Sequence, residues 1–321
     1  MHLRFAAAFV CLALIAFHAC AQGYPAKPLR LIVADAPGGS SDLRARQVAP
    51  KLGEALGQAV VIDNRPGGSM IIAAEMAARA APDGYTLFLG NVVTHSLNPL
   101  VFKSLPYRAD RDFVPVTLIT SAPLLLAVNP QVAAATLPEL VALAKARPNQ
   151  FQYGGIGRGS PQYLLMEQLN AATGAQFMFV PYKSVGTSVQ DVLGGHMPIG
   201  LQFWSVIGAM VKSGKLRAIA VAAPRRLEVA PDIPTFAEAG VPDVVGYGWQ
   251  GIFVPAGTPA PIVQRLHVEL AGVFKLQEIR NPIIETGAEP GGNTPAEFAS
   301  FIRADQERSK KAADLAGLVP E

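Results

Sequence analysis

The sequence predicts an α/β protein of two lobes, and the order of its segments supports this fold class in three ways. Short apolar segments alternate repeatedly with segments of helical periodicity, a pattern typical of layered α/β folds with largely parallel sheets. The alternation falls into two blocks, the first ending near residue 121 and the second near residue 223. The segments beyond are mostly helical and lack enough strands for a third domain, so we expect them to return to the first block.

These observations predict lobe 1 at 22–122 and 227–321, and lobe 2 at 123–226. Chain crossings near 120–125 and 222–227 would form a hinge with a cleft between the lobes. A length of 321 residues suits two domains of ordinary size.

The first block begins with a strand, a turn and a helix, and this unit recurs along the chain. Its predicted elements are strands at 29–34, 59–64 and 86–91, and helices from about 42 to 56, closed by Gly57, and from about 70 to 80. Pro50 lies inside the earlier helix and should kink or shorten it, because proline lacks an N–H donor and its ring clashes with the preceding turn.

The second block repeats the alternation, and its first helix is capped by Thr136. Its predicted elements are strands at 124–129, 151–155, 177–183, 197–203 and 216–223, and helices at 136–146, 156–169, 188–195 and 206–214. A proline-rich segment at 224–242 connects rather than packs. The tail then contains a strand at 249–255 and helices at about 259–274, 277–285 and 295–316.

Residues 1–21 have the layout of a cleaved secretory signal peptide. Arg4 precedes an apolar run, and Ala19-Cys20-Ala21 provides a small-x-small cleavage site. The run is shorter than the roughly 20 residues that a membrane-spanning helix needs, so we expect an exported, periplasmic protein. The alternative is a lipid anchor on Cys20, although the residues before Cys20 fit it poorly.

Both cysteines, Cys11 and Cys20, fall within this predicted signal peptide. The exported chain should therefore contain no thiol, which excludes a disulfide scaffold, a cysteine nucleophile and a thiolate metal site. Its stability must come from a buried core, and 50% of the residues are hydrophobic.

The charge balance argues against a nucleic-acid partner. Charged residues make up 16% of the chain, the formal net charge is +3, and the sequence has no long basic run. An isoelectric point near 8.9 is compatible with an anionic small-molecule ligand.

Two glycine-rich turns, one in each lobe, place hydroxyl groups at the start of a helix. They are "APGGSSD" at 36–42 and "GGIGRGSPQ" at 154–162. A helix N-terminus presents unpaired N–H groups and a partial positive charge, so it holds carboxylates or phosphates without a cationic side chain. Ser40, Ser41 and Ser160 could donate to such an anion or could cap their helices. The pairing of the two turns favours a ligand shared by the lobes.

Other chemistries match the sequence less well. Neither turn has the lysine of a phosphate-binding loop, and the second lacks the third glycine of a dinucleotide site. No serine stands in G-x-S-x-G, and His95, His196 and His267 do not have metal-ligand spacing. We therefore expect no metal, no cofactor and no catalysis. Two alternatives stay open: an exported hydrolase or lyase using His95 or Asp42 as the acid–base group, and a ligand sensor for a signalling partner.

Segments over nearly the whole exported chain resemble the receptors of tripartite tricarboxylate transporters, the Bug family. The resemblance is carried, in the family's order, by motifs that include "APGGSSD", "NRPGGS", "PDGYTLFLGN", "THSLNP", "GGIGRGSPQYLLMEQL", "VPYKSVGTSVQDVLGG", "APDIPTFAEAGVP" and "GIFVPAGTPAPIV". It implies a type II periplasmic binding-protein fold whose lobes close on one small carboxylate, either a di- or tricarboxylate or an aromatic acid. It also implies a monomeric receptor that delivers this ligand to membrane permease subunits.

The resemblance also assigns ligand-binding residues by position, because the family's first turn holds the ligand carboxylate largely through backbone groups and ordered water. These residues are Pro37, Gly38, Gly39, Ser40, Ser41, Asp42, Asn91 and Thr94 in lobe 1, and Gly157, Gly159 and Ser160 in lobe 2. The strand end after "LGG" adds Gln202 and Phe203. Tyr182, at the end of another strand, is expected to line the cleft.

The sequence departs from the family's pattern in lobe 2, where the family usually carries acidic residues. Pro198 and Gln202 occupy those positions, so the cleft lacks a partner for a ligand's ammonium group. We therefore expect a plain organic or aromatic carboxylate rather than an amino acid. Phe203 and Trp204 could stack on a ring or pack in the core, and Trp249 is expected to be a core residue.

Overall fold

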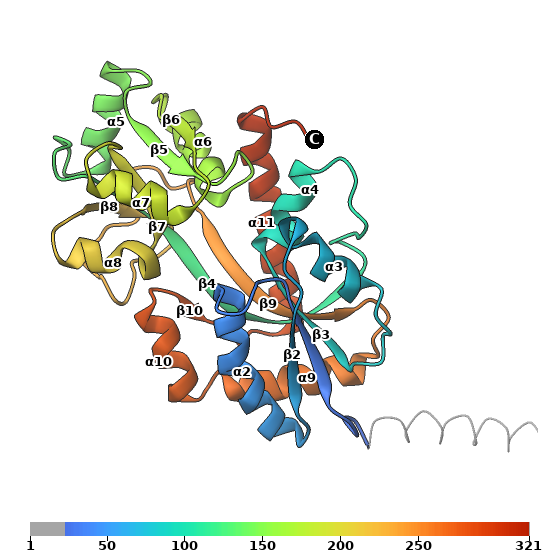
Figure 1. Cartoon of the computed structure of the whole chain (residues 1–321). Coiled ribbons are helices and arrows are strands. Elements are labelled where there is room, and N and C mark those ends of the chain that lie inside the picture. Colours follow the sequence, from blue (N-terminus) through green and yellow to red (C-terminus); the bar gives the residue numbers. More distant parts are fainter. Residues whose placement is uncertain (1–22, 321) are drawn as a thin grey trace, which may run out of the picture.

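The computed structural model describes residues 23–320 and consists of two blocks joined by long strands (Figure 1). One block contains the N-terminal and C-terminal segments, and the other contains the middle of the chain. The predicted α/β class is confirmed. The predicted signal peptide at 1–21, with the alternative anchor Cys20, lies outside the described residues.

The strands follow one path in the order β2-β1-β3-β9-β4-β7-β5-β6, and β8 and β10 pair with β4. They are β1 Leu29–Val33, β2 Val60–Asn64, β3 Thr86–Asn91, β4 Phe113–Val128, β5 Gln152–Gly155, β6 Met178–Pro181, β7 Ile199–Phe203, β8 Arg217–Val221, β9 Tyr247–Pro255 and β10 Glu289–Pro290. β1 pairs parallel with β2 and β3, and β5 pairs parallel with β6 and β7. β4 and β9, however, are antiparallel to their neighbours. The expectation of largely parallel sheets is therefore wrong for these two central strands.

β4 is a single strand that runs through both blocks, whereas the sequence predicts a new strand only at 124–129. Its first part pairs with β9, and residues 124–128 pair with β7 and β8. Prolines at 115 and 123 lie within this strand, although proline cannot donate to a ladder. The pairing of β4 with β9 shifts register between Pro115 and Thr117 and between Leu118 and Thr120, and such irregularities allow a strand to bend.

The chain crosses back from the second block to the first block beside β4. The Leu124 N–H donates to the Gly246 carbonyl (3.0 Å), and the Ala222 N–H donates to the Leu124 carbonyl (2.8 Å). Between these points the chain stays with the second block, where Leu227 and Ile233 join its hydrophobic cluster. On this geometry the second crossing lies at 245–247 rather than at 222–227, and the division into lobes stays a prediction.

The helices follow the predicted order closely. They are α2 Ser40–Leu56, α3 Ile71–Ala78, α4 Asn98–Val101, α5 Leu137–Ala146, α6 Pro161–Thr173, α7 Val185–Leu193, α8 Trp204–Lys212, α9 Ala260–Val273, α10 Gln277–Glu285 and α11 Pro295–Leu315, with short helices η1 Gly68–Met70 and η2 Val93–Leu97. Thr136 caps α5 in a capping box with Glu139, as the sequence predicts. The expected shortening at Pro50 is wrong, because α2 continues to Leu56 and ends at the left-handed Gly57.

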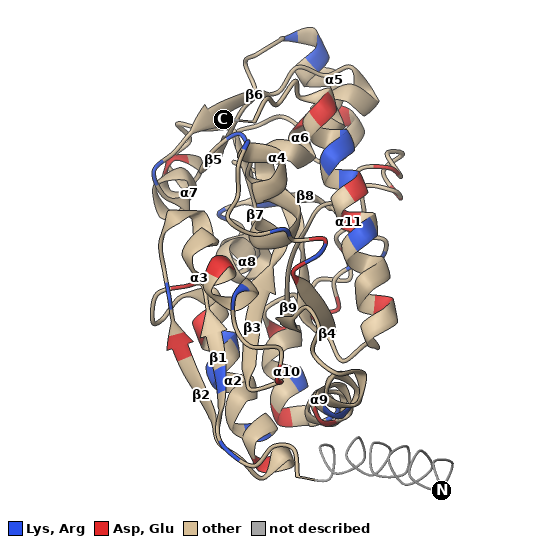
Figure 2. Cartoon of the chain, turned by 90° about the vertical axis from the view of Figure 1, so that its right-hand side faces the viewer, with Lys and Arg blue, Asp and Glu red and all other residues tan. Residues whose placement is uncertain are grey.

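Helices cover both faces of the first block's sheet. α2, α9 and α10 pack on one face against strand residues such as Leu31, Leu87 and Ile252. α3 and α11 pack on the other face, where Trp249 is buried in the core as predicted. Figure 2 shows basic and acidic residues interspersed over both blocks, with both signs along α11.

A buried carboxylate on α11 ties the C-terminal helix to the first block. Asp305 accepts hydrogen bonds from Ser96 Oγ (2.6 Å) and Trp249 Nε1 (2.9 Å), and its other oxygen pairs with Arg308 (2.6 Å). Only 3% of Asp305 is exposed, so these partners replace the water that the charge has lost.

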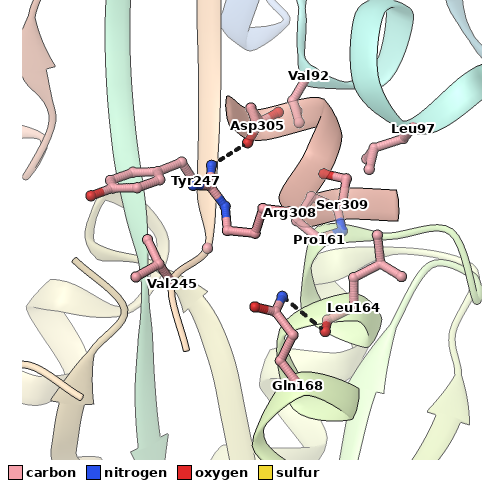
Figure 3. Close-up of a pocket in the computed structure, with 11 residues that line it drawn as sticks. Val92, Leu97, Pro161, Leu164, Gln168, Val245, Tyr247, Asp305, Arg308 and Ser309 are labelled. Carbon is pink, nitrogen blue, oxygen red and sulfur yellow. Dashed lines mark hydrogen bonds and ion pairs between the residues drawn. The ribbon is translucent and has the colours of Figure 1, made fainter. Parts of the chain in front are cut away.

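A small cavity separates α11 from the second block at this point (Figure 3). Pro161, Leu164 and Gln168 of α6 line one side, and Asp305 and Arg308 line the other. Its volume of about 20 Å³ has room for about one water molecule. An organic ligand does not fit there, so this contact belongs to the packing of the blocks.

Replacing Asp305 with alanine should lower the free energy of unfolding by about 3 kcal/mol, since three hydrogen bonds to a buried charge are lost. Urea denaturation measures this change. The matched control is Asp314→Ala on the same helix, whose carboxylate is 65% exposed and pairs with Lys310, and which should change stability by less than about 0.5 kcal/mol. Equal effects of the two substitutions would contradict the role assigned to Asp305.

Candidate functional site

The first glycine-rich turn is held by two carboxylates that bind its backbone. The Gly38 N–H donates to Asp42 Oδ2 (2.9 Å), and the Ser41 N–H donates to Asp35 Oδ2 (2.7 Å). Asn64 Nδ2 donates both to the Asp35 carbonyl (2.9 Å) and to Asp42 Oδ1 (3.0 Å). Gly38 has a φ of 84°, a conformation that favours glycine. The turn is therefore a preformed structure.

Asp42 stabilises this turn through hydrogen bonds to its side-chain carboxylate. The hydrogen bond from Arg46 (2.7 Å) and that from the Gly38 N–H lower the pKa of the Asp42 carboxyl from its ordinary value of 3.8 to about 2. Both of its oxygens are engaged, and only 1% of the residue is exposed. Asp42 is thus placed as a support of the turn, and a carboxylate so strongly held is poorly suited to accept protons at neutral pH.

The side chains that remain at the start of α2 are two serines, and a glutamine of β9 reaches them. Gln250 Nε2 donates to Ser40 Oγ (3.4 Å) and Ser41 Oγ (3.3 Å). The Ser40 hydroxyl itself donates to Asp35 Oδ2 (3.4 Å), whereas the Ser41 O–H has no acceptor among the described residues. Pro37 is exposed at the turn beside them.

Two buried polar atoms beside these serines have no hydrogen-bond partner among the described residues: Gln250 Oε1 and Thr120 Oγ1. Thr120 and Gln250 are partners across β4 and β9, so their side chains leave the same face of the sheet. Since Gln250 reaches the start of α2, Thr120 lies on that face too. Only 7% of Thr120 is exposed, and a buried hydroxyl without a partner is uncommon in folded proteins.

Thr120, Gln250, Asp35 and Asn64 were not predicted as site residues. The available signal for Thr120 and Gln250 is a polar residue within a strand that is otherwise apolar, "TLITSAP" and "WQGIFVP". Periodicity does not show which polar strand residue lies beside which helix start, because the pairing of β4 with β9 joins distant segments.

Asn91 and Thr94 lie next to the polar row formed by Thr120 and Gln250, but their side chains form hydrogen bonds within the turn after β3. Asn91 Oδ1 accepts from the N–H groups of Val93 (3.0 Å) and Thr94 (3.1 Å), and Thr94 Oγ1 accepts from the Asn91 N–H (3.0 Å). Asn91 Nδ2 donates to Met70 Sδ (3.1 Å). Asn91 is the β3 register partner of Gln250, so the turn that Asn91 stabilises lies directly beside the row of Thr120 and Gln250.

The second glycine-rich turn lies against the first block. A Cβ added to Gly159 would stand 2.3 Å from Val101 Cγ2 of α4, which means that the backbone at 159 touches the other block. Gly157 faces open space. Ser160 caps α6, because its Oγ accepts from the Tyr163 N–H (3.3 Å).

Gln202 and Tyr182 have partners within the second block. Gln162 Nε2, at the start of α6, donates to Gln202 Oε1 (3.3 Å), and both side chains are buried. The Tyr182 hydroxyl donates to Asp191 Oδ2 (2.5 Å), and this bond together with burial raises the pKa of the Tyr182 hydroxyl to about 12. Gln162 was not predicted as a site residue.

Phe203 and Trp204 each pack on a glycine of the first block. A Cβ on Gly248 would stand 2.7 Å from Phe203 Cζ, and one on Gly287 would stand 2.5 Å from Trp204 Cβ. Gly248 precedes Gln250 by two residues on β9 and shares its face of the sheet. The half-buried Phe203 ring therefore lies beside the row of Thr120 and Gln250.

His95 lies in the core. Burial lowers the pKa of its imidazole to about 3, its ring stacks on Phe253 at 3.9 Å between centroids, and Nδ1 bonds to Thr94 Oγ1 (2.9 Å). This histidine is neutral at physiological pH and packed between rings, an arrangement unsuited to acid–base catalysis.

Residues 23–320 contain no group of three or more His, Cys, Asp or Glu side chains arranged to hold a metal ion. In this same part of the chain, none of the helices combines the length and apolar character needed to span a bilayer.

Replacing Asp42 with asparagine should destabilise the protein in a pH-dependent manner. The folded pKa near 2 lies below the ordinary value of 3.8, so the ionised carboxylate stabilises the fold above about pH 4 and loses this contribution as the pH falls toward 2. The difference in unfolding free energy between wild type and Asp42→Asn, measured by urea denaturation between pH 6 and pH 2, should shrink as the pH falls from about 4 to 2. A difference that stays constant with pH would contradict this assignment.

Comparisons with known proteins agree with this architecture. A family model described as "Tripartite tricarboxylate transporter family receptor" matches residues 44–318. Protein BugT of Bordetella pertussis is 35% identical over 305 residues, which cover 94% of this chain and 92% of BugT.

Solved structures give the same result. R. palustris Rpa4515 with adipate has a TM-score of 0.79 at 33% identity, covering 93% of this chain and 100% of that one. MatC of Rhodopseudomonas palustris with bound malate has a TM-score of 0.73 at 30% identity, covering 90% and 99%. The fold is that of periplasmic solute-binding proteins, and the resemblance seen in the sequence is confirmed. This chain belongs to the TctC family of tripartite tricarboxylate transporter receptors.

Proposed function

We propose that the protein is a periplasmic receptor that binds a small organic carboxylate and delivers it to the permease subunits of a tripartite transporter. The observation that carries this proposal is the Thr120 hydroxyl, which has no partner within residues 23–320, beside the O–H group of Ser41 at the start of α2. Leaving a buried hydroxyl unpaired costs about 1–3 kcal/mol, and a bound carboxylate would supply the missing acceptor.

The proposed site holds the anion with neutral groups. The α2 N-terminus contributes the positive end of its dipole, and the hydroxyls of Ser41 and Thr120 donate to the carboxylate. Gln250 Oε1 would accept from an ordered water or from a ligand hydroxyl. The turn that starts α6 contacts the first block through Gly159, so the second block would cover the ligand as a monomeric receptor closes.

The relatives support the ligand class and the biological setting. The adipate and malate in the neighbouring structures are small carboxylates, and the family is one of transporter receptors. We extend this class, the periplasmic location and the transport role to this chain.

A ligand without an ammonium group fits the proposed site best. Asp35 and Asp42 both bind the backbone of the turn, and Gln202 pairs with Gln162. The Phe203 ring beside the row offers an apolar surface to a hydrocarbon or aromatic body.

Thr120→Val should lower carboxylate affinity about tenfold while leaving stability within about 0.5 kcal/mol of wild type, since the hydroxyl has no partner to lose. The ligand for calorimetry comes from a thermal-shift screen of aliphatic and aromatic acids, where about 100-fold saturation adds about 2.7 kcal/mol of stability.

Thr117→Val on the same strand is the matched control. Thr117 Oγ1 donates to the Asn293 carbonyl (2.7 Å), so its loss should cost about 1 kcal/mol of stability and leave affinity unchanged. Unchanged affinity in Thr120→Val would remove the main support for the site.

Succinate should bind at least about tenfold more tightly than aspartate, which differs by one ammonium group, because that group would be desolvated without an acidic partner. Competition against a bound carboxylate measures the ratio. Preferential binding of aspartate would overturn the ligand class proposed here.

A further inference from the structure

Trp204, the first residue of α8, connects the two blocks through a contact with Gly287. Its side chain is buried, and a Cβ added to Gly287 would stand 2.5 Å from Trp204 Cβ and 2.8 Å from Trp204 Cγ. Atoms in a packed interior do not approach so closely, so the ring has room there only because residue 287 lacks a Cβ. Figure 1 shows α8 beside β10 and α10 of the first block.

The Trp204 ring is fixed within the second block. It lies on Gly208, one turn further along α8, where an added Cβ would stand 2.6 Å from Trp204 Cε2. Lys212 Nζ lies 5.6 Å from the ring centroid, within reach of a cation–π contact. Leu125 and Ile207 belong to the same hydrophobic cluster as Trp204. The ring therefore moves together with the second block.

Gly287 is fixed within the first block, where it ends α10. Its φ of 70° is left-handed, and the N–H groups of Gly287 and Ala288 donate to the carbonyls of Ile284 (2.8 Å) and Ile283 (3.3 Å). These two hydrogen bonds form a Schellman cap, which favours glycine at this position. Contact with Trp204 is a second and independent constraint on the same residue.

The contact joins surfaces that approach each other as the blocks close. Trp204 follows the carboxyl end of β7, and the second glycine-rich turn follows the carboxyl end of β5, which pairs parallel with β7. Both segments leave the same edge of the sheet and touch the first block, the turn through Gly159 on Val101 and the ring on Gly287. Further closure would press the ring onto Gly287.

The contact also lies near the strand that joins the blocks. Phe203, directly before Trp204, is the register partner of Leu124 on β4. Gly287 leads into β10, which pairs with β4 beside Thr120. Because the contact lies close to the connecting strand, a small change in its thickness produces a large change in the angle between the blocks.

We propose that Trp204 and Gly287 form a stop that sets the angle at which the second block closes over the ligand. This rests on the proposed function, in which closure retains a bound carboxylate. Neither residue belongs to the row of Thr120 and Gln250, so Trp204 acts as a positioning residue for the parts of the second block that cover this row. A methyl group added at position 287 would hold the blocks apart, and the ligand would dissociate faster.

The test introduces that methyl group as Gly287→Ala in the exported chain. Among succinate, malate, adipate and benzoate, the acid that binds the wild type best is the probe, and its dissociation rate should rise at least about fivefold in the variant. Double electron–electron resonance between spin labels on Arg79→Cys, after α3, and Lys145→Cys, on α5, should lose its shortest distances. Both positions are exposed, and residues 23–321 contain no other cysteine.

Trp204→Ala combined with Gly287→Ala is the rescue variant, because it removes the ring that the new methyl group meets. Its dissociation rate and label distances should match those of Trp204→Ala alone, the rates within about twofold. An effect of alanine on the α10 cap would persist without the ring. A change in Gly287→Ala that remains in the double variant would therefore overturn the proposal, as would a Gly287→Ala variant with wild-type rate and distances.

Gly57→Ala is the matched control. Gly57 ends α2 with a φ of 69° and donates, with Gln58, to the carbonyls of Glu54 and Gly53, but within residues 23–320 an added Cβ there has no neighbour closer than 4 Å. This variant should share the strain of a left-handed alanine and keep the wild-type rate and distances.

If Gly287→Ala does not fold, Trp204→Ala decides the same point. Without the ring, the label distances of the acid-bound protein should extend to shorter values, and an unchanged distribution would overturn the proposal. If none of the four acids binds the wild type, the proposed function fails, whereas the shortest label distances of the free protein still test the stop.

Discussion

The pairing of β4 with β9 is the constraint on which the two blocks and the candidate site both depend. β4 runs from one sheet into the other, and β9 returns beside it, so the backbone ladder that joins the blocks also sets the Thr120–Gln250 register. Prolines and register shifts bend β4 within the ladder. A slip of one residue in this pairing would turn the polar row to the opposite face of the sheet.

The start of α2 illustrates how the fold prepares a site for an anion. Two carboxylates already bind the turn, one to the Gly38 N–H and one to the Ser41 N–H. Their presence fixes the turn without a ligand, but it also uses donors that the helix would otherwise offer. The hydroxyls of Ser41 and Thr120 therefore matter more to the proposed function than the bare helix N-terminus does.

The C-terminal helix connects the same site to the contact between the blocks. Through Asp305, α11 holds Ser96 of η2 and Trp249 of β9, and each of these elements continues into residues beside the candidate site. α11 also faces α6 across the small cavity of Figure 3, and α6 begins at Ser160 in the second turn. The tail of the chain thus belongs structurally to the site even though it contributes no proposed ligand contact.

The sequence by itself determined the alternation of strands and helices, the main caps, the α/β class and the family, because these follow from local periodicity and from contiguous motifs. It also located the two turns and their serines. Only the tertiary structure decided which polar groups face one another. Asp42, Asn91 and Thr94 were read as ligand contacts, but their side chains are engaged in the backbone of their own turns. Thr120 and Gln250 were missed, since they become neighbours through strand pairing across more than a hundred residues. The continuous β4 and the late return crossing were hidden for the same reason: hydrogen bonds and burial between distant segments leave no periodic trace in the chain.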